Sequence, residues 1–127
     1  MIVKKEAIVA LAPVADHSAK EGYFVSLTAG ETVVLTSATA VVPFGVILDG
    51  EDTDGQDSIG VCGGAFGSAL VKLSGTVAVG DSLQLHTDGS VVVDAGSGAR
   101  IVVAKALQAG NSGELIEAVI LTPVQYS

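Results

Sequence analysis

Few residues in this chain have side chains that could do chemistry, and they are scattered. The chain has two histidines, His17 and His86, and one cysteine, Cys62. Neither histidine has a cysteine or a carboxylate at the spacing of a metal site such as HExxH. The GxSxG turn that presents a nucleophilic serine in many hydrolases is also absent from the sequence. We therefore expect no catalytic residue, no metal site and no cofactor, and a protein that is not an enzyme.

The densest polar cluster is an acidic segment in the middle of the chain. Five acidic residues lie close together there: Asp49, Glu51, Asp52, Asp54 and Asp57. Ca²⁺ takes six to eight oxygen ligands, and such a segment could supply several. Aligning Gly55 with the glycine of an EF-hand loop, however, places Val61 where the bidentate glutamate belongs. We interpret the segment as a solvated loop that could contact a basic partner, with an irregular Ca²⁺ site as the alternative.

Charge and composition limit the partners. The formal net charge is −8, and only 6 residues are Lys or Arg. Binding to a phosphate backbone or an anionic membrane needs clustered cations, so we expect no nucleic-acid partner and no membrane partner. The apolar run Ala7–Ala12 is too short for the core of a signal peptide, which predicts synthesis in the cytoplasm without export. Cys62 cannot form an internal disulfide, and we interpret it as a small buried side chain, with a reactive thiol as the alternative.

The elements that must position these residues are short strands. Gly is 16 of the residues, and β-branched residues alternate with polar ones, which indicates strands joined by tight turns. Asp88-Gly89 predicts a hairpin. Pro43 predicts that the apolar run Val41–Leu48 is an edge strand or a bulged strand. Residues 100–110 fit a strand better than a short helix, which remains the alternative. The sequence thus predicts an all-β fold, a compact β-barrel or β-sandwich of about nine short strands.

One local pattern occurs three times. A turn with glycine and an acid or amide precedes apolar residues in AGETVVL, VGDSLQL and AGNSGELIEAVIL. The unequal spacing between the copies argues against a solenoid repeat. The pattern indicates either convergent turn chemistry or repeated use of one way to enter a strand.

The chain divides at one point in this interpretation. Residues 1–21 are predicted to be an extended N-terminal arm or a first strand, and residues 22–127 a single β-barrel-like domain. The arm carries five apolar residues that could pair with a partner's sheet. These candidate contact residues are Ile2, Val3, Ile8, Val9 and Leu11.

From residue 22 onward the chain resembles the capsid cement, or head decoration, proteins of tailed bacteriophages, a group labelled DUF2190. The stretches that carry the resemblance occur in order along the chain: GYFVSLTAGETVVLTSA, PFGVILDG, GVCGG, GSALVKLSGTVAVGDSLQL, DGSVVVD and AKALQAGNSGELIEAVIL. The resemblance implies a β-barrel-like protein on the exterior of the virion capsid. There it would form a homotrimer and clamp neighbouring copies of the major capsid protein, without a cofactor or active site.

Two further classes of protein remain as alternatives. An adhesive or carbohydrate-binding β domain of the virion would be expected to offer aromatic platforms, and the chain has only Tyr23, Tyr126 and three Phe. A carrier barrel of the lipoyl or biotinyl type would need a lysine at a hairpin tip. The hairpin sequence HTDGSV has none.

Overall fold

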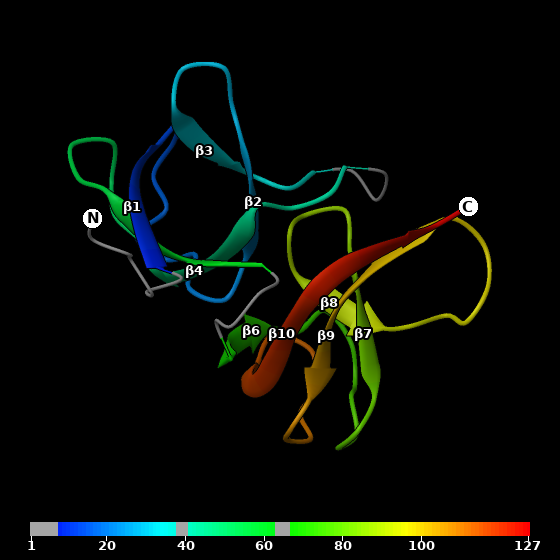
Figure 1. Ribbon diagram of the computed structural model, residues 1–127. Helices are drawn as coiled ribbons and strands as arrows, with labels where there is room; N and C mark the ends of the chain where they lie inside the picture. The colour runs from blue at the N-terminus through cyan, green and yellow to red at the C-terminus, as the bar shows by residue number, and fades with distance from the viewer. Residues whose placement is uncertain (1–7, 38–40, 63–66) are drawn as a thin grey trace, which may run out of the picture.

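The computed structural model describes residues 8–37, 41–62 and 67–127, and these residues form an all-β fold (Figure 1). Ten strands occur in the described part of the chain: β1 (Ile8–Pro13), β2 (Phe24–Leu27), β3 (Thr32–Leu35), β4 (Gly45–Asp49), β5 (Asp57–Val61), β6 (Ser68–Lys72), β7 (Ser82–Leu85), β8 (Val91–Val93), β9 (Arg100–Ala106) and β10 (Leu115–Tyr126). The first five form a closed barrel in the order β1-β3-β2-β4-β5, and the other five form an open sheet in the order β6-β10-β9-β7-β8.

The barrel closes because β1 pairs on both of its sides. It runs antiparallel to β5, with Ile8 opposite Gly60, and parallel to β3, with Ala12 opposite Thr32. Side chains alternate between the two faces of a strand, so every second residue points into the barrel. The barrel interior consists of four fully or almost fully buried residues with partly buried apolar residues packed around them. The four are Val25, Val33, Ile47 and Ile59.

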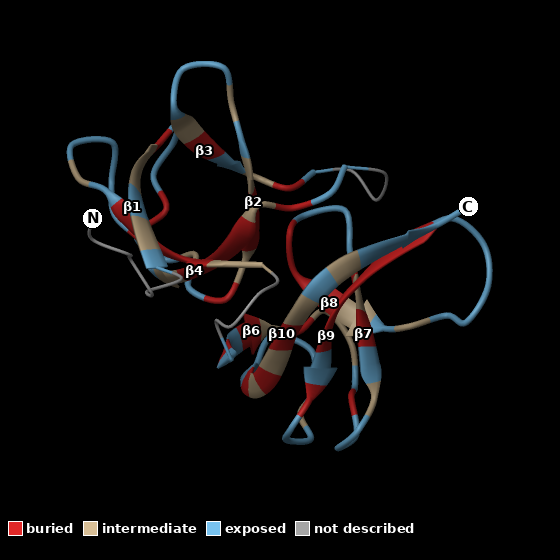
Figure 2. Cartoon of the chain, in the orientation of Figure 1, coloured by how far each residue is buried: buried red, intermediate tan, exposed pale blue. Residues whose placement is uncertain are grey.

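The open sheet has a larger core on one of its faces. Val71 and Leu73 from β6 and the residue after it, Leu83 from β7, and Ile101 and Val103 from β9 are all buried there. Figure 2 shows this buried side in red along β9, with pale blue on the turns. The buried face of the sheet therefore needs another part of the chain to cover it.

The barrel provides that cover. Phe24 of β2 and Val46 of β4 lie opposite each other in the ladder and are buried in the core of the sheet rather than inside the barrel. The hairpin between β7 and β8 also contacts the backbone of Phe24. The Phe24 amide donates to the Gly89 carbonyl at 2.8 Å, and a Cβ at Gly89, whose φ is 88°, would lie 2.8 Å from the Phe24 carbonyl oxygen. The barrel thus has an interior of its own and also contributes two residues to the core of the sheet.

Two turns of the sheet interlock. In the first turn the Gly80 amide donates to the carbonyl of Ala106, which ends β9. In the second turn the Gly113 amide donates to the carbonyl of Leu73, which follows β6. Each turn is thus closed by the strand that leads into the other turn. Both turns have glycine at positive φ, 88° at Gly80 and 90° at Gly113.

The same relation extends through the strands on either side of the turns. β6 pairs with β10 with Lys72 opposite Leu115, and β9 pairs with β7 with Lys105 opposite Ser82. Lys105 follows Lys72 by the same number of positions as Gly113 follows Gly80. Lys105 in the strand that leads into the second turn therefore corresponds to Lys72 in the strand that leads into the first. Val77 and Gly110 exchange two backbone hydrogen bonds at the centre of this arrangement. The two turns and the strand pairs that flank them, β6 with β10 and β9 with β7, are therefore related by an approximate internal two-fold axis.

The predicted fold class is confirmed. The fold is an all-β barrel, extended by a sheet that the sequence did not separate from it. Residues 100–106 form strand β9, and Asp88-Gly89 turns a hairpin, as predicted. Pro43 precedes β4 instead of interrupting it, and the β4–β5 ladder has an irregularity between Ile47 and Asp49. Because β1 closes the barrel, the barrel contains residues on both sides of the predicted division between residues 21 and 22.

Candidate functional site

The end of the barrel that carries Asp49, Glu51, Asp52 and Asp54, which we call the acidic end, is organised around a buried hydrogen bond between a histidine and an aspartate. His17 lies in the connection between β1 and β2, and Asp57 is the first residue of β5. The His17 Nδ1 atom and the Asp57 Oδ2 atom are 2.6 Å apart, and the residues are 2 % and 0 % exposed. The other carboxylate oxygen of Asp57 accepts the Glu51 amide at 2.9 Å. The pair therefore ties two loops together beneath the surface.

Backbone contacts reinforce this tie. The His17 amide donates to the Glu51 carbonyl at 2.9 Å, and a Cβ at Gly50 would lie 1.9 Å from the His17 carbonyl oxygen. No side chain other than hydrogen fits at position 50 without movement of the backbone. The two loops therefore meet at a fixed distance.

The five predicted acidic contact residues have different roles. Asp49, Glu51, Asp52 and Asp54 are exposed, whereas Asp57 is completely buried. Asp57 therefore cannot contact a partner directly, and its role is to hold the loop. The sequence did not reveal this difference, because it depends on His17, which is distant along the chain.

The described residues offer no prepared metal site at this end. No group of three or more His, Cys, Asp or Glu side chains in the described part of the chain lies close enough to hold a metal ion. The exposed carboxylates instead make a solvated surface. The Asp16 carboxylate, in the adjoining loop, accepts hydrogen bonds from Ser18, and these lower its pKa from the ordinary value. Asp16 thus adds another negative charge to this end.

The predicted arm residues that the structure describes face opposite sides of strand β1. Ile8 points outward and is 44 % exposed, whereas Val9 and Leu11 are partly buried and pack against the barrel core. Ile2 and Val3 lie outside the described residues, as does most of the glycine-rich segment at 63–67. Of the candidates that the structure describes, Ile8 alone presents an apolar side chain to the surroundings.

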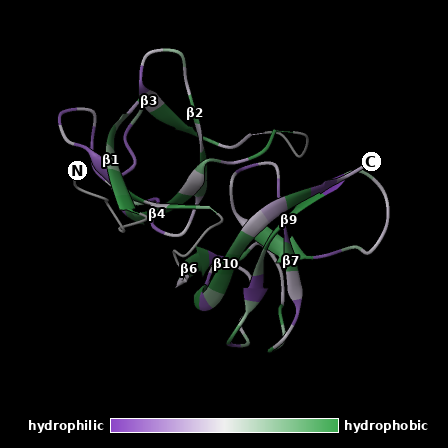
Figure 3. Cartoon of the chain, viewed as in Figure 1, coloured by the Kyte–Doolittle hydropathy of each residue, from purple (hydrophilic) through white to green (hydrophobic). Residues whose placement is uncertain are grey.

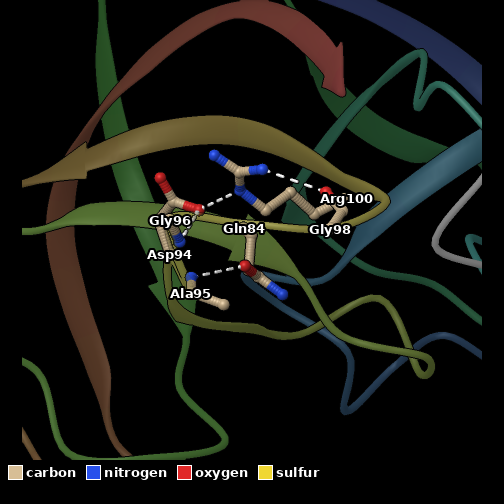
Figure 4. A network of polar contacts seen from close by, with 6 residues as sticks. All are labelled: Gln84, Asp94, Ala95, Gly96, Gly98 and Arg100. Atoms are coloured by element: carbon tan, nitrogen blue, oxygen red, sulfur yellow. Dashed lines mark hydrogen bonds and ion pairs between the residues drawn. The ribbon is translucent and has the colours of Figure 1, made fainter. Parts of the chain in front are cut away.

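A second polar network closes the loop between β8 and β9 (Figure 4). The Arg100 guanidinium donates to the Asp94 carboxylate and to the Gly98 carbonyl, and the Gln84 side chain accepts the Ala95 amide at 2.8 Å. Hydrogen bonding from the Gly96 amide, and then from Arg100, lowers the pKa of Asp94 although partial burial opposes this. Arg100 also lies over the Tyr126 ring, 4.1 Å from its centre. The polar groups of Gln84, Asp94 and Arg100 therefore form hydrogen bonds that hold the loop between β8 and β9.

The remaining candidate reactive side chains are Cys62, which is shielded, and His86, which is exposed. Cys62 packs against the sheet core, and burial raises the pKa of its thiol to about 12, so the thiol stays protonated and unreactive at neutral pH. His86 is exposed beside the β7–β8 hairpin, and nearby Asp88 bonds to Ser90. The described part of the chain contains no helix that could cross a membrane, and no cavity was found within it.

Fold and surface together define a class, an all-β protein with a closed five-stranded barrel joined to an open five-stranded sheet. Neither a protein-family model nor a curated protein matches the chain. Among solved structures it is similar to the N base of head fiber gp8.5 of bacteriophage phi29, with a TM-score of 0.65 and 18% sequence identity. The match covers 94% of this chain and 97% of that chain. At this level of identity the likeness is one of fold.

Proposed function

We propose that this chain is a structural protein of a bacteriophage virion and that it binds the outside of the head as a cement protein. In this role it stabilises contacts between neighbouring copies of the major capsid protein. The observation that carries the proposal is the fold shared, over almost the whole of both chains, with the base of a phage head fiber. The order of sequence stretches that resemble cement proteins supports it independently.

The way this chain uses its polar groups also supports a binding role without catalysis. Its buried histidine is paired with Asp57, and its buried arginine is paired with Asp94, in both cases to hold loops. A protein present in many equal copies on a lattice needs only a modest interface for each copy, because the contributions add over the shell. Rigid loops favour such an interface, since little conformational entropy is lost on binding.

The acidic end is the contact surface proposed for a basic patch on the capsid. Asp52 and Asp54 are exposed there on a loop that the hydrogen bond between His17 and Asp57 fixes. Residues 1–7 are the second proposed contact. Truncation to test that arm must stop before Ile8, because β1 closes the barrel from that residue onward.

Cosedimentation with purified heads that lack the protein tests the proposal. We expect the wild-type chain to pellet with expanded heads and not with immature ones. The double variant Asp52→Lys/Asp54→Lys should bind more weakly, by about tenfold, because it removes the proposed charge pairing. Its matched control is Glu21→Lys/Glu31→Lys, which makes the same change in net charge at other exposed loop positions of the barrel.

The outcomes separate the two parts of the proposal. Failure of the wild-type chain to bind either form of the head would overturn the cement role. Equal binding by the two double variants would leave the cement role standing and reject the acidic end as the contact. A capsid reconstruction that locates the chain on the tail would place it in the virion but reject cementing of the head.

A further inference from the structure

Three aspartates in this chain are followed directly by glycine: Asp49, Asp54 and Asp88. At such a step the backbone nitrogen of the glycine can attack the side-chain carboxyl of the aspartate, because glycine has no Cβ to hinder the approach. The reaction is intramolecular, so its rate depends on whether the carboxyl carbon can reach that nitrogen. Since the dipeptide is the same at all three positions, its surroundings decide where the reaction occurs.

The step at Asp49 is restrained by packing. Asp49 ends β4 and lies opposite Ser58 in the ladder with β5. The glycine that follows, Gly50, is buried, and a Cβ there would lie 1.9 Å from the His17 carbonyl oxygen. The peptide between Asp49 and Gly50 therefore cannot turn toward the Asp49 carboxyl without moving the backbone at His17.

The step at Asp88 is restrained by hydrogen bonds. The Asp88 carboxylate accepts the Ser90 amide at 3.0 Å and the Ser90 hydroxyl, so it is directed past the Gly89 nitrogen. Gly89 is buried, and its carbonyl accepts the Phe24 amide. Although partial burial acts in the opposite direction, the hydrogen bonds from Ser90 keep the pKa of Asp88 below its ordinary value. Ring closure needs the neutral carboxyl as its electrophile, so the lowered pKa also protects this step.

The step at Asp54 is restrained only by its own turn. Asp54 lies in the exposed turn between β4 and β5, and Figure 3 shows purple, hydrophilic residues on this turn beside the green strand β1. In the described part of the chain no group donates a hydrogen bond to the Asp54 carboxylate. The Gly55 amide donates to the Asp52 carbonyl at 3.1 Å, and the atoms that a Cβ at Gly55 would meet first belong to the exposed side chain of Glu51. A single exposed turn bond must therefore open before the Gly55 nitrogen can attack.

We propose that Asp54-Gly55 is a site of spontaneous isoaspartate formation in the folded protein. The Gly55 nitrogen attacks the Asp54 Cγ atom and loses its proton, a C–N bond forms, and the carboxyl loses its hydroxyl, so that water leaves and a five-membered succinimide closes. Water then adds to one of the two ring carbonyls. Addition at Cγ restores aspartate. Addition at the Asp54 backbone carbonyl breaks the original peptide bond, so the chain then runs through the side chain and the former backbone carbonyl becomes a free carboxylate.

The reaction changes the acidic end without changing the composition of the chain. It lengthens the backbone of the turn by one methylene and moves one carboxylate, while the water that leaves is replaced. The hydrogen bond between His17 and Asp57 lies outside the turn, so the barrel should stay folded. This inference does not rest on the proposed function, because the reaction needs only the chain and water.

Incubation of the full-length chain at neutral pH and body temperature tests the proposal. Methylation by a protein isoaspartyl methyltransferase counts the isoaspartate, and fragmentation of the tryptic peptides 21–72 and 73–100 locates it. We expect isoaspartate to form at Asp54 at least about tenfold faster than at Asp49 or Asp88, because only Asp54 can reach the attacking nitrogen. In guanidinium chloride the restraints are lost, so the three steps should react at similar rates.

Two matched variants complete the test. Asp54→Glu keeps the charge but can close only a six-membered ring, which forms far more slowly, so most of the isoaspartate in the folded chain should disappear. Asp49→Glu makes the same change at a restrained step and should leave the amount of isoaspartate unchanged. Far-UV circular dichroism verifies that each variant is folded.

Three results would overturn the inference. If the unfolded chain forms isoaspartate at Asp54 and the folded chain does not, the turn protects this step as well. Similar rates at all three steps of the folded chain would mean that the packing of Gly50 and the hydrogen bonds of Asp88 do not restrain the reaction. An undiminished amount of isoaspartate in Asp54→Glu would place the reaction elsewhere in the chain.

Discussion

His17 and Asp57 show how a single pair of side chains decides where a charged loop lies. Both are buried, and their side chains are hydrogen-bonded to each other. A buried pair contributes little net stability compared with two apolar residues, but loss of one partner leaves the other unpaired in a medium of low dielectric constant. The exposed carboxylates of the loop owe their position to this pair.

Replacement His17→Ala is therefore expected to lower the free energy of unfolding by about 3–5 kcal/mol, because the Asp57 carboxylate stays buried without its partner. Chemical denaturation measures the change. His86→Ala is the matched control, since His86 is exposed, and it should change stability by about 0.5 kcal/mol at most. Equal effects of the two substitutions would show that the buried pair does not fix the loop.

A second variant separates the lost pair from the lost side-chain volume. Adding Asp57→Ala to His17→Ala removes the unpaired carboxylate, so the double variant should cost less than the sum of the two single variants. A strictly additive result would mean that the two side chains act independently, in disagreement with their 2.6 Å contact.

At the scale of elements, the interlocked turns explain the repeated pattern in the sequence. Two of its three copies, VGDSLQL and AGNSGELIEAVIL, form the interlocked pair, in which Asp81 and Glu114 each accept a backbone amide of their own turn. The third copy, AGETVVL, instead belongs to the β2–β3 hairpin, where the Thr28 amide donates to the Thr32 carbonyl. One sequence pattern thus serves two structural roles.

The internal two-fold relation predicts matched effects of matched substitutions. Gly80→Ala and Gly113→Ala each force a side chain into a left-handed backbone conformation, and a Cβ at either position meets no atom within 4 Å. Each should therefore cost about 1 kcal/mol from backbone strain alone. Thermal or urea denaturation measures both. Gly75→Ala, where φ is not positive and the nearest atom is 3.8 Å away, should cost less; clearly unequal losses at positions 80 and 113 would contradict the equivalence.

At the scale of the whole molecule, barrel and sheet are joined because two residues of the barrel strands are buried in the core of the sheet. Phe24 belongs to a barrel strand by its backbone and to the sheet core by its side chain. The Lys72 amide at the end of β6 also donates to the Gly22 carbonyl beside β2, at 3.0 Å. The two halves should therefore unfold in a single transition.

The two tyrosines provide a probe for each half, because Tyr23 packs against the barrel core and Tyr126 lies at the end of the sheet. In the wild type, fluorescence of single-tyrosine variants should give coincident transitions. Phe24→Ala should destabilise the protein by about 3–5 kcal/mol and separate the two transitions. Phe44→Ala, which removes packing within the barrel, is the control and should leave the transitions coincident. Separate transitions in the wild type would mean that the junction is weak.

Sequence patterns predicted features that depend on near neighbours. The hairpin at Asp88-Gly89 follows from the φ preference of Gly89, whose φ is 88°, and β9 from its β-branched residues. Burial of Asp57, the inward direction of Val9 and the division into barrel and sheet depend instead on contacts between distant segments. His17 and Asp57 could be recognised as partners only once β1 and β5 are known to lie side by side.

The interlocked turns also bear on the order in which the chain can fold. Neither turn is complete until the strand leading into the other has arrived, so residues 73–85 and 106–118 must assemble together. This raises the entropic cost of the folding nucleus, because a long loop closes before its contacts are formed. The same dependence should slow the reverse process, since both turns must open before either strand is released. A chain assembled in this way is expected to fold slowly and, once folded, to unfold slowly.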